Sequence, residues 1–591
     1  MRGAPPSVAV LGAATTTEPS LLPVTHREWL EARLRGFAAD VVWIRDGSSS
    51  EWERVAEVVT SAPGAVGLVD ATFVGHTAPL ADTIADARFG SALLTDDRGF
   101  HGVLKIDSAD RPAAVASIRE LAAAGAPVRV SLLAEQLMTS GVQLHRVDPG
   151  PYVAGFASGP ADARQLLQRV NDLDEHRLRL AASARPRDGF YSTFVVRKVS
   201  RQVTALALRL HLRPNAVTAA SLVVGLTAAI LFAAGEQWAL VAGAILLQVS
   251  LVLDCVDGEI ARYTRQFTPF GAWLDAVADR VKEFAAYAGM AVGVARSGET
   301  VWLLACSALA LLMVRHHVDF GFATYTAGAQ GTAPTAAGAP RLAYPASSAS
   351  AQSGRRRWGN RAEVWSERTN RHPVLTWAKR VITMPIGERW LVISVVAPIW
   401  GARAVFIVLL VTGAVAALYT TTGRVMRTMA DRAPEPSAAR DLAVLTEVPA
   451  LVNPSSPPVW LAGRLGWLAP ATARLFESVT VIALATALDG AAMIAAFGML
   501  ALVAIHLYDL VYRMRHLHRP PSAWASAAVL GSVSRPAVLA VAAMVGPSVF
   551  VTVCVALGTL VIVVSVVDGR ASWLGSAPVE RQLTYAEARP Q

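Results

Sequence analysis

The sequence predicts a multi-pass α-helical membrane protein with a soluble α/β domain at its N-terminus and extra helices at its C-terminus. The chain has 591 residues, of which 53% are hydrophobic and 17% are charged, and its mean hydropathy is +0.40. Such a composition predicts several membrane spans. Residues 1–187 carry no apolar run of membrane length, whereas such runs follow one another after them. We therefore expect three parts, 1–187, 188–432 and 433–591.

Charge and cysteine content narrow the classes of partner. The formal net charge is +9, and Lys and Arg gather beside the apolar segments. This pattern favours a lipid bilayer and phosphorylated substrates as partners, and not nucleic acid. The three cysteines, Cys255, Cys306 and Cys554, lie in apolar stretches at spacings that fit neither a disulfide framework nor a zinc site. We expect them to serve packing only.

The first part alternates short apolar runs with amphipathic stretches, which predicts an α/β sheet domain. Strands are expected at 8–11, 41–44, 66–69 and 128–133, and helices at 28–37 and 113–124. Their order resembles a nucleotidyltransferase domain with a Rossmann-like sheet. That resemblance implies a glycine-rich phosphate loop ending in a basic residue, but Leu11 to Glu18 has one glycine and no Lys or Arg. We therefore expect a degenerate, regulatory or docking domain that transfers no cytidylyl group.

Asp70 follows the third expected strand, and two interpretations of it remain open. It stands where a nucleotidyltransferase would place a metal-binding aspartate. A lone Asp at the end of a strand is also a common turn or cap residue.

Four aspartates within a short stretch carry the strongest chemical signal. In a helix, Asp254 and Asp257 lie on one face, and Asp275 and Asp279 lie four residues apart on the next expected helix. Two such helices side by side would direct four carboxylates into one pocket, where their repulsion requires a cation. Oxygen ligands without His or Cys favour Mg²⁺ or Mn²⁺ over zinc.

Residues between these aspartates suit a phosphorylated ligand. Gly258 and Ala261 share the face of Asp254 and leave a groove without large side chains, which a flat base or a diphosphate can approach. Arg262 offers a planar guanidinium for phosphate oxygens. Carboxylate-bound metal ions with an arginine are the groups that neutralise charge in phosphoryl transfer.

The full pattern, D-x2-D-G-x2-A-R-x8-G-x3-D-x3-D from Asp254 to Asp279 with Gly271 at its centre, resembles the signature of the CDP-alcohol phosphotransferases. The resemblance implies transfer of a substituted phosphate from a CDP-linked donor to an alcohol, with release of CMP. It implies two Mg²⁺ or Mn²⁺ ions held by Asp254, Asp257 and Asp275. Asp279 would share a metal and act as the base, and Gly258, Ala261 and Arg262 would contact the donor. The structural alternative is a set of interfacial charges that cap two helices.

Other segments of the central part add candidate binding residues. The segment from Pro214 to Thr218 resembles the PNxxT segment that lines the nucleotide pocket of this family, so Asn215 and Thr218 are candidates, with helix capping as the alternative. Arg315 and Arg389 are expected at the same end of the bundle. They would suit a phosphorylated acceptor or, equally, would anchor the protein at lipid headgroups.

Six spans are expected in the central part, at 214–235, 237–253, 272–296, 301–318, 390–402 and 404–421. Before them, Phe194 to Leu212 reads as a basic amphipathic helix at the headgroup level, with an ordinary cytosolic helix as the alternative. Lys and Arg are concentrated at one set of connections, including 262–282 and 355–389. The positive-inside rule then places the aspartates and the N-terminal domain on the cytoplasmic side of the cell membrane. The insert at 327–385 is expected to be disordered in its first half.

The third part begins with a Pro- and Ser-containing linker at 433–458 and continues with apolar stretches at 479–512 and 537–567. The segment from His506 to Arg513 resembles a C-terminal module of unknown role that is attached to actinobacterial members of the family. Its polar residues recur at helical spacing and would form an interhelical network or line a cleft.

The resemblance leaves the substrates open. The donor is CDP-diacylglycerol or CDP-inositol, and the acceptor is a polyol or a polyol phosphate, for which inositol phosphate is the leading candidate. A homodimer is one assembly that the family resemblance allows. The competing hypothesis is a non-catalytic membrane scaffold or regulatory pseudoenzyme, which the unbroken aspartate pattern disfavours.

Overall fold

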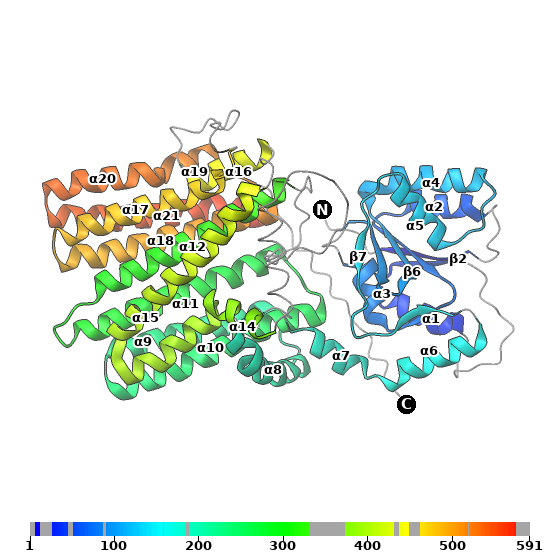
Figure 1. Cartoon of the computed structure of the whole chain (residues 1–591), viewed down its shortest axis with the longest axis horizontal. Helices are drawn as coiled ribbons and strands as arrows, with labels where there is room; N and C mark the ends of the chain where they lie inside the picture. The colour runs from blue at the N-terminus through cyan, green and yellow to red at the C-terminus, as the bar shows by residue number, and fades with distance from the viewer. Residues whose placement is uncertain are drawn as a thin grey trace.

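The computed structural model shows an α/β domain beside a large helical bundle (Figure 1). It describes residues 6–11, 26–44, 51–86, 90–157, 159–184, 188–329, 373–430, 436–447, 461, 463–517 and 519–574. Eight described helices are long and apolar enough to cross a membrane. The chain is thus a multi-pass membrane protein with an N-terminal α/β domain.

The N-terminal domain contains a mixed six-stranded sheet with the order β2-β1-β3-β6-β5-β7. β1 is parallel to β2 and β3, and β6 is antiparallel to β3 and β5. The strands are Ser7–Leu11, Asp40–Ile44, Val66–Asp70, Ala92–Asp96, Gly99–Ile106 and His145–Val147 for β1, β2, β3, β5, β6 and β7. A small second sheet pairs β4 (Phe73–Gly75) with β8 (Ala154–Phe156).

Helices cover both faces of the larger sheet. One apolar core includes side chains of α1 (His26–Arg35), α3 (Thr77–Ile84) and α6 (Pro160–Asp172). The other includes side chains of α2 (Trp52–Ser61), α4 (Arg111–Ala123) and α5 (Val130–Thr139). Three of the four expected strands and both expected helices are therefore confirmed.

The strand expected at 128–133 is wrong, because this segment enters helix α5. Val130, Leu133, Ala134 and Leu137 are buried, and their spacing is that of one helical face. A short apolar run cannot by itself distinguish a strand from the start of such a helix.

Of the two nucleotidyltransferase-like features of this domain, the phosphate-loop segment and Asp70, the structure describes mainly Asp70. Residues 12–25 lie outside the described part, so the structure does not describe most of the expected phosphate-loop segment. Asp70 ends β3, and its Oδ1 accepts hydrogen bonds from the backbone N–H of Thr72 at 2.9 Å and from the Thr72 hydroxyl at 2.7 Å. These contacts are those of a turn residue.

The central bundle begins with a π-helical turn (Ser192–Val196) and α8 (Arg197–Arg209), which overlap the amphipathic helix expected from Phe194 to Leu212. Long helices follow, namely α9 (Pro214–Ala234), α10 (Gln237–Thr264), α11 (Pro269–Ala295), α12 (Trp302–Ala329), α14 (Pro373–Ile382) and α15 (Ile386–Ala430). α10 extends beyond the apolar span expected at 237–253, so the first half of the aspartate pattern lies within one helix, as its spacing predicts. The disordered segment expected in the first half of the insert lies outside the described residues, apart from its first residues, which extend α12.

Six membrane-length segments can still be counted in this part. α9, α10 and α12 are three of the eight apolar helices, and α11, which has a more polar sequence, packs chiefly against α9. α15 is a single element interrupted at Gly401, where φ is 78°. Since Pro398 precedes the break by less than one turn, the two expected spans at 390–402 and 404–421 correspond to its two halves.

The C-terminal part adds α16 (Pro436–Thr446), α17 (Ala469–Thr486), α18 (Gly490–Leu517), α19 (Ala523–Ala528), α20 (Gly531–Val545) and α21 (Pro547–Leu574). Each of the two expected apolar stretches covers parts of two helices. The first contains the turn between α17 and α18, and the second breaks at Gly546, where φ is 148°. Of these helices, α16, α17 and α18 pack against α12 of the central part, and α18 also packs against α11 (Figure 1).

Candidate functional site

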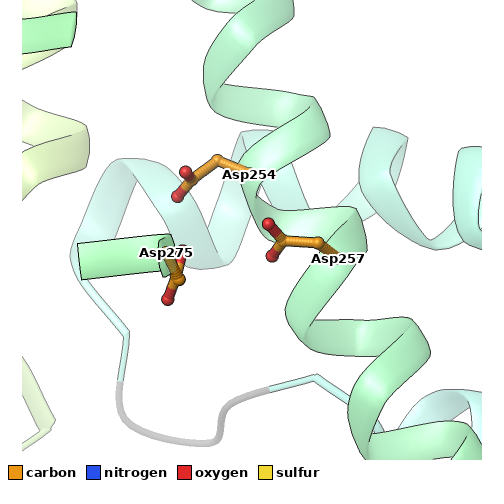
Figure 2. Close-up of side chains that lie close together, drawn as sticks. All are labelled: Asp254, Asp257 and Asp275. Carbon is orange, nitrogen blue, oxygen red and sulfur yellow. The ribbon is translucent and has the colours of Figure 1, made fainter. Parts of the chain in front are cut away.

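The aspartate pattern forms a carboxylate cluster at the facing ends of α10 and α11. One carboxylate oxygen from each of Asp254, Asp257 and Asp275 lies within 4.8 Å of the others. Figure 2 shows that the two α10 side chains point toward the one from α11. The turn between the helices is closed by Thr268, whose hydroxyl accepts the backbone N–H of Gly271 at 2.9 Å.

The fourth carboxylate, Asp279, joins this cluster through a lysine. Lys282 Nζ lies 2.7 Å from Asp254 Oδ1 and 3.1 Å from Asp279 Oδ1, and the lysine side chain has no exposed area. It also donates to the Ser221 hydroxyl at 2.9 Å. Sequence analysis missed Lys282, although its position one turn beyond Asp279 places it on the same helix face.

Asn215 and Thr218 of α9 lie against the cluster. The Thr218 hydroxyl donates to Asp257 Oδ2 at 2.5 Å, and Asp257 is only 4% exposed. A Cβ atom at Gly271 would lie 3.1 Å from Asn215 Oδ1 and 2.9 Å from Thr268 Oγ1. Gly271 therefore lets the start of α11 approach α9 closely. Thr218 does more than cap a helix, because its hydroxyl bonds to Asp257 in the site.

The expected donor-binding residues occupy the last turns of α10. A Cβ atom at Gly258 would lie 3.0 Å from Arg262 Nη1, so the guanidinium lies directly over the glycine. Arg262 Nε donates to the backbone carbonyl of Ser183, which follows α7 (Glu175–Ala182). Ala261 is half-buried beside Arg262.

The N-terminal domain contacts this end of α10. Arg265, in a left-handed conformation with φ 57°, donates to Asp82 Oδ1 at 2.6 Å and to the carbonyl of Ala78 at 3.0 Å. The Tyr263 hydroxyl pairs with His176 Nδ1 at 2.6 Å. The domain therefore adjoins the expected donor-binding residues.

The two arginines expected at the acceptor side converge on one loop. Arg315 donates to the carbonyl of Thr383 at 2.7 Å, and Arg389 donates to the carbonyl of the next residue, Met384, at 2.9 Å. Arg389 also pairs with both oxygens of Glu283, at 2.7 and 3.0 Å. Since Arg389 is 6% exposed, its position is unlike that of a headgroup anchor.

Glu283 is a second residue that sequence analysis missed. It is fully buried, and it also accepts a hydrogen bond from Arg280 at 2.6 Å. Three guanidinium groups, of Arg280, Arg315 and Arg389, thus gather around one loop and one carboxylate. The sequence signal that could have identified Glu283 is its spacing of one helical turn from Asp279 along α11.

An apolar groove of about 580 Å³ lies between α8, α10 and α15. α8 is held there by its polar face, since Arg197, Ser200 and Thr204 all donate to Glu259 of α10. Its apolar side chains are left for the groove or the lipid. The groove is lined by Val199, Val203, Ala244, Ile245, Gln248, Val249, Val252, Leu253, Leu391, Ser394 and Val395. It therefore reaches the residue immediately before Asp254.

Comparison with known families defines the class of the central part. Residues 211–346 match the family described as CDP-alcohol phosphatidyltransferase, and residues 435–582 match a family of unknown function, DUF5941. The chain therefore carries a CDP-alcohol phosphatidyltransferase domain, whose family consists of transferases, followed by a DUF5941 domain.

Characterised relatives share parts of this chain. A "Bifunctional IPC transferase and DIPP synthase" of Aquifex aeolicus is 36% identical over 105 residues, which are 18% of this chain and 23% of the relative. Two proteins named "Phosphatidylinositol phosphate synthase" are 38% identical over 16% of this chain (Mycolicibacterium smegmatis) and 32% identical over 20% of it (Cutibacterium acnes). The matches span 41% and 58% of those two relatives, so the chain covers less than two thirds of each.

Proposed function

We propose that the protein transfers a substituted phosphate from a CDP-linked donor to an alcohol acceptor and releases CMP. The observation that carries this proposal is the convergence of Asp254, Asp257 and Asp275 from two helices. Buried carboxylates within a helical membrane bundle are costly unless they have a function or a compensating charge. Lys282 compensates part of this charge and leaves an excess of carboxylates.

The residues fit a divalent metal centre. Asp254, Asp257 and Asp275 supply only carboxylate oxygens, which suit Mg²⁺ or Mn²⁺. Two such ions, when bound, would neutralise the charge that develops on the donor diphosphate. Thr218 orients Asp257 through its hydrogen bond, and Lys282 holds Asp254 and Asp279 in place.

The remaining residues have separable roles in the reaction. Asp279 takes the proton of the acceptor hydroxyl, whose oxygen forms a bond to the phosphorus that carries the donor's alcohol group. The bond from that phosphorus to the bridging oxygen breaks, and CMP leaves with the bonding electrons. Arg262 contacts the donor phosphates, while Gly258 and Ala261 leave room for the nucleotide beside α10.

We further propose a lipid-linked donor, CDP-diacylglycerol, and not CDP-inositol. The apolar groove supports this choice, because it begins beside Asp254 and is lined almost wholly by apolar side chains. The acyl chains of CDP-diacylglycerol would be buried in this groove, whereas CDP-inositol has no apolar chain that would occupy it.

The acceptor is proposed to be a phosphorylated polyol, with inositol phosphate as the leading candidate. Arg315 and Arg389 converge at one loop, and with Arg280 they outnumber the two carboxylates that they contact, those of Glu283 and Asp279. A phosphate group would balance this positive charge. Two relatives carry the name phosphatidylinositol phosphate synthase, which agrees with this assignment.

The proposal places the active site and the N-terminal domain on the cytoplasmic side of the cell membrane. It rests on the concentration of Lys and Arg at the connections next to the aspartates.

The test uses the full chain in lipid nanodiscs with Mg²⁺ and measures CMP release. CDP-diacylglycerol and CDP-inositol are each combined with inositol phosphate, glycerol phosphate, inositol, glycerol and serine. We expect release with CDP-diacylglycerol and a phosphorylated polyol. Equal turnover with unphosphorylated acceptors would refute the acceptor assignment, and no release from any donor would favour the scaffold hypothesis.

A further inference from the structure

The C-terminal module, defined here as α16 to α21, contacts the metal-site helix α11 at two aromatic side chains. The rings of Trp573 in α21 and Trp273 in α11 have centroids 5.5 Å apart. The Tyr508 ring of α18 lies 5.6 Å from the guanidinium carbon of Arg280 in α11. Trp273 and Arg280 are about two helical turns apart, and Asp275 and Asp279 lie between them.

Tyr508 is fixed by the central bundle as well as by its own helix. It is 5% exposed, its hydroxyl pairs with His316 Nδ1 of α12, and its ring meets the edge of Phe320 with centroids 5.7 Å apart. Its face toward Arg280 is a cation–π contact in a buried setting. Arg280 in turn bonds Glu283 at 2.6 Å and lies 3.9 Å from Asp279 Oδ2. Tyr508 is therefore linked to the predicted base, Asp279, through Arg280.

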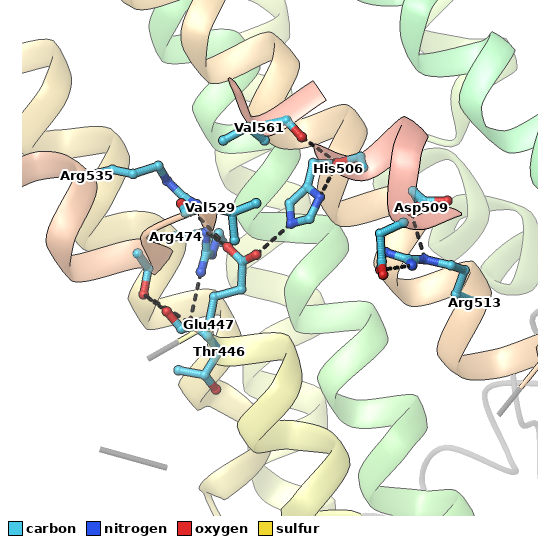
Figure 3. Close-up of polar contacts among 12 residues, drawn as sticks. Thr446, Glu447, Arg474, His506, Asp509, Arg513, Val529, Arg535 and Val561 are labelled. Carbon is cyan, nitrogen blue, oxygen red and sulfur yellow. Dashed lines mark hydrogen bonds and ion pairs between the residues drawn. The ribbon is translucent and has the colours of Figure 1, made fainter. Parts of the chain in front are cut away.

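Trp573 is held by a chain of polar contacts within the module. Its Nε1 donates to Asp509 Oδ1 at 3.0 Å. Asp509 pairs with Arg513 at 2.9 Å, and Arg513 pairs with Asp568 at 2.5 Å (Figure 3). Since Asp509 lies one residue after Tyr508, one turn of α18 carries Tyr508 and also holds Trp573 of α21.

A second buried network joins the helices α16, α17, α18 and α20 of the module. Arg535 of α20 binds Glu477 of α17 at 2.6 Å and Glu447, just after α16, at 2.9 Å. Arg474 binds Glu477 at 2.7 Å, and His506 of α18 pairs with Glu447 at 2.7 Å (Figure 3). A buried network of this kind resists relative movement of the helices that it joins.

We propose that the C-terminal module is a brace that sets the position of Asp275 and Asp279, with Tyr508 and Trp573 as its positioning residues. Metal ligands must be held within a fraction of an ångström of their productive geometry, and a helix end braced on two sides meets that requirement. The consequence for turnover rests on the proposed transfer reaction, whereas the consequence for metal affinity does not.

The experiment compares Tyr508→Leu and Trp573→Leu in the full chain with matched controls in the same module. Tyr512→Leu removes a tyrosine whose ring contacts His516 of its own helix, and Trp524→Leu removes a tryptophan that is 51% exposed. Mn²⁺ affinity is measured by electron paramagnetic resonance without substrate, and Asp257→Asn defines the background. Thermal unfolding and the kcat and KM of CMP release are measured on the same samples.

We expect each test variant to weaken Mn²⁺ binding and to lower kcat by about tenfold. This is about the size of one cation–π contact for Tyr508 and of one aromatic pair for Trp573. The KM for the donor and the unfolding temperature should match those of the controls, and Tyr508→Phe, which keeps the ring, should restore most of both losses. Equal Mn²⁺ affinity in Tyr508→Leu, Trp573→Leu and the unaltered protein would overturn the brace. If the unaltered protein itself binds Mn²⁺ no more strongly than Asp257→Asn does, both the metal centre and the brace are overturned. Tyr508-dependent Mn²⁺ binding without CMP release would refute only the transfer reaction.

Discussion

Two buried polar clusters within the helical bundle differ in their balance of charge. In the C-terminal module, Arg474 and Arg535 face Glu447 and Glu477, and every one of these charges is paired. In the central part, three carboxylates approach one another within 4.8 Å, and the ammonium group of Lys282 pairs with Asp254. The first arrangement is complete without a ligand, whereas the second requires additional positive charge.

The difference separates structural from functional use of buried charge. A neutralised network can be retained because it fixes how helices pack, and its loss is felt as instability. A cluster of like charges destabilises the bundle until a cation binds, so the presence of these residues indicates a ligand-binding function. Mutations that remove one charge from each cluster should therefore have opposite signatures.

The largest effect is expected from breaking the balanced network. Arg535→Met leaves Glu477 and Glu447 with one partner fewer in a buried site, which should lower the free energy of unfolding by about 3 to 5 kcal/mol. Unfolding in denaturing detergent measures this loss. Arg519→Met, an exposed arginine of the same module, is the control. A loss below about 1 kcal/mol would show that the network contributes little to stability.

Breaking the unbalanced cluster should abolish turnover and leave stability unchanged. We expect Asp257→Asn to reduce CMP release by about a hundredfold or more, because the four aspartates act together on the metal ions. Without metal its unfolding free energy should not fall, since one repulsive charge is gone and the asparagine oxygen still accepts from Thr218. Asp172→Asn on the exposed surface of α6 is the control. Near-normal turnover under Mg²⁺ would end the enzyme hypothesis.

The arginines at the acceptor side allow a finer test of the same comparison. Arg315→Gln should weaken acceptor binding by about 1.5 to 3 kcal/mol, because a charge-assisted contact to phosphate is lost, while donor binding stays nearly intact. Titration of each substrate separately gives the two KM values. Arg403→Gln alters an exposed ion pair with Glu299 and should change neither. If Arg315→Gln changes the KM of the donor and the KM of the acceptor equally, Arg315 stabilises the bundle and does not bind the acceptor.

The N-terminal domain is expected to add no chemistry. With CTP, Mg²⁺ and a polyol phosphate, the Asp257→Asn chain should release no pyrophosphate and form no CDP-alcohol, because Leu11 to Glu18 lacks the glycines and basic residue of a phosphate loop. The Asp257→Asn background prevents the central part from consuming any product. Formation of a CDP-alcohol would show that the domain is an active nucleotidyltransferase.

Much of the candidate site could be predicted because helical periodicity converts spacing into shared faces. Asp254 and Asp257 on one helix and Asp275 on the next needed only two adjacent helices to meet, and a short turn makes them adjacent. Hydropathy likewise predicted where the membrane helices lie. It also separated two spans close to the break at Gly401. It did not identify the helix that begins at Val130, because short apolar runs fit more than one element.

The sequence by itself determined the class of protein, and it predicted the three-part organisation and the residues that would bind metal, since each depends on local composition or on spacing within one helix. Only the tertiary structure decided that Lys282 enters the carboxylate cluster, that Glu283 pairs with Arg389, and that the C-terminal module contacts α11. Trp273 and Trp573 are 300 positions apart in the numbering, and no local pattern links them. Such contacts are selected by the packing of whole helices, because burying a charge or an aromatic ring is favourable only where the partner has already been placed.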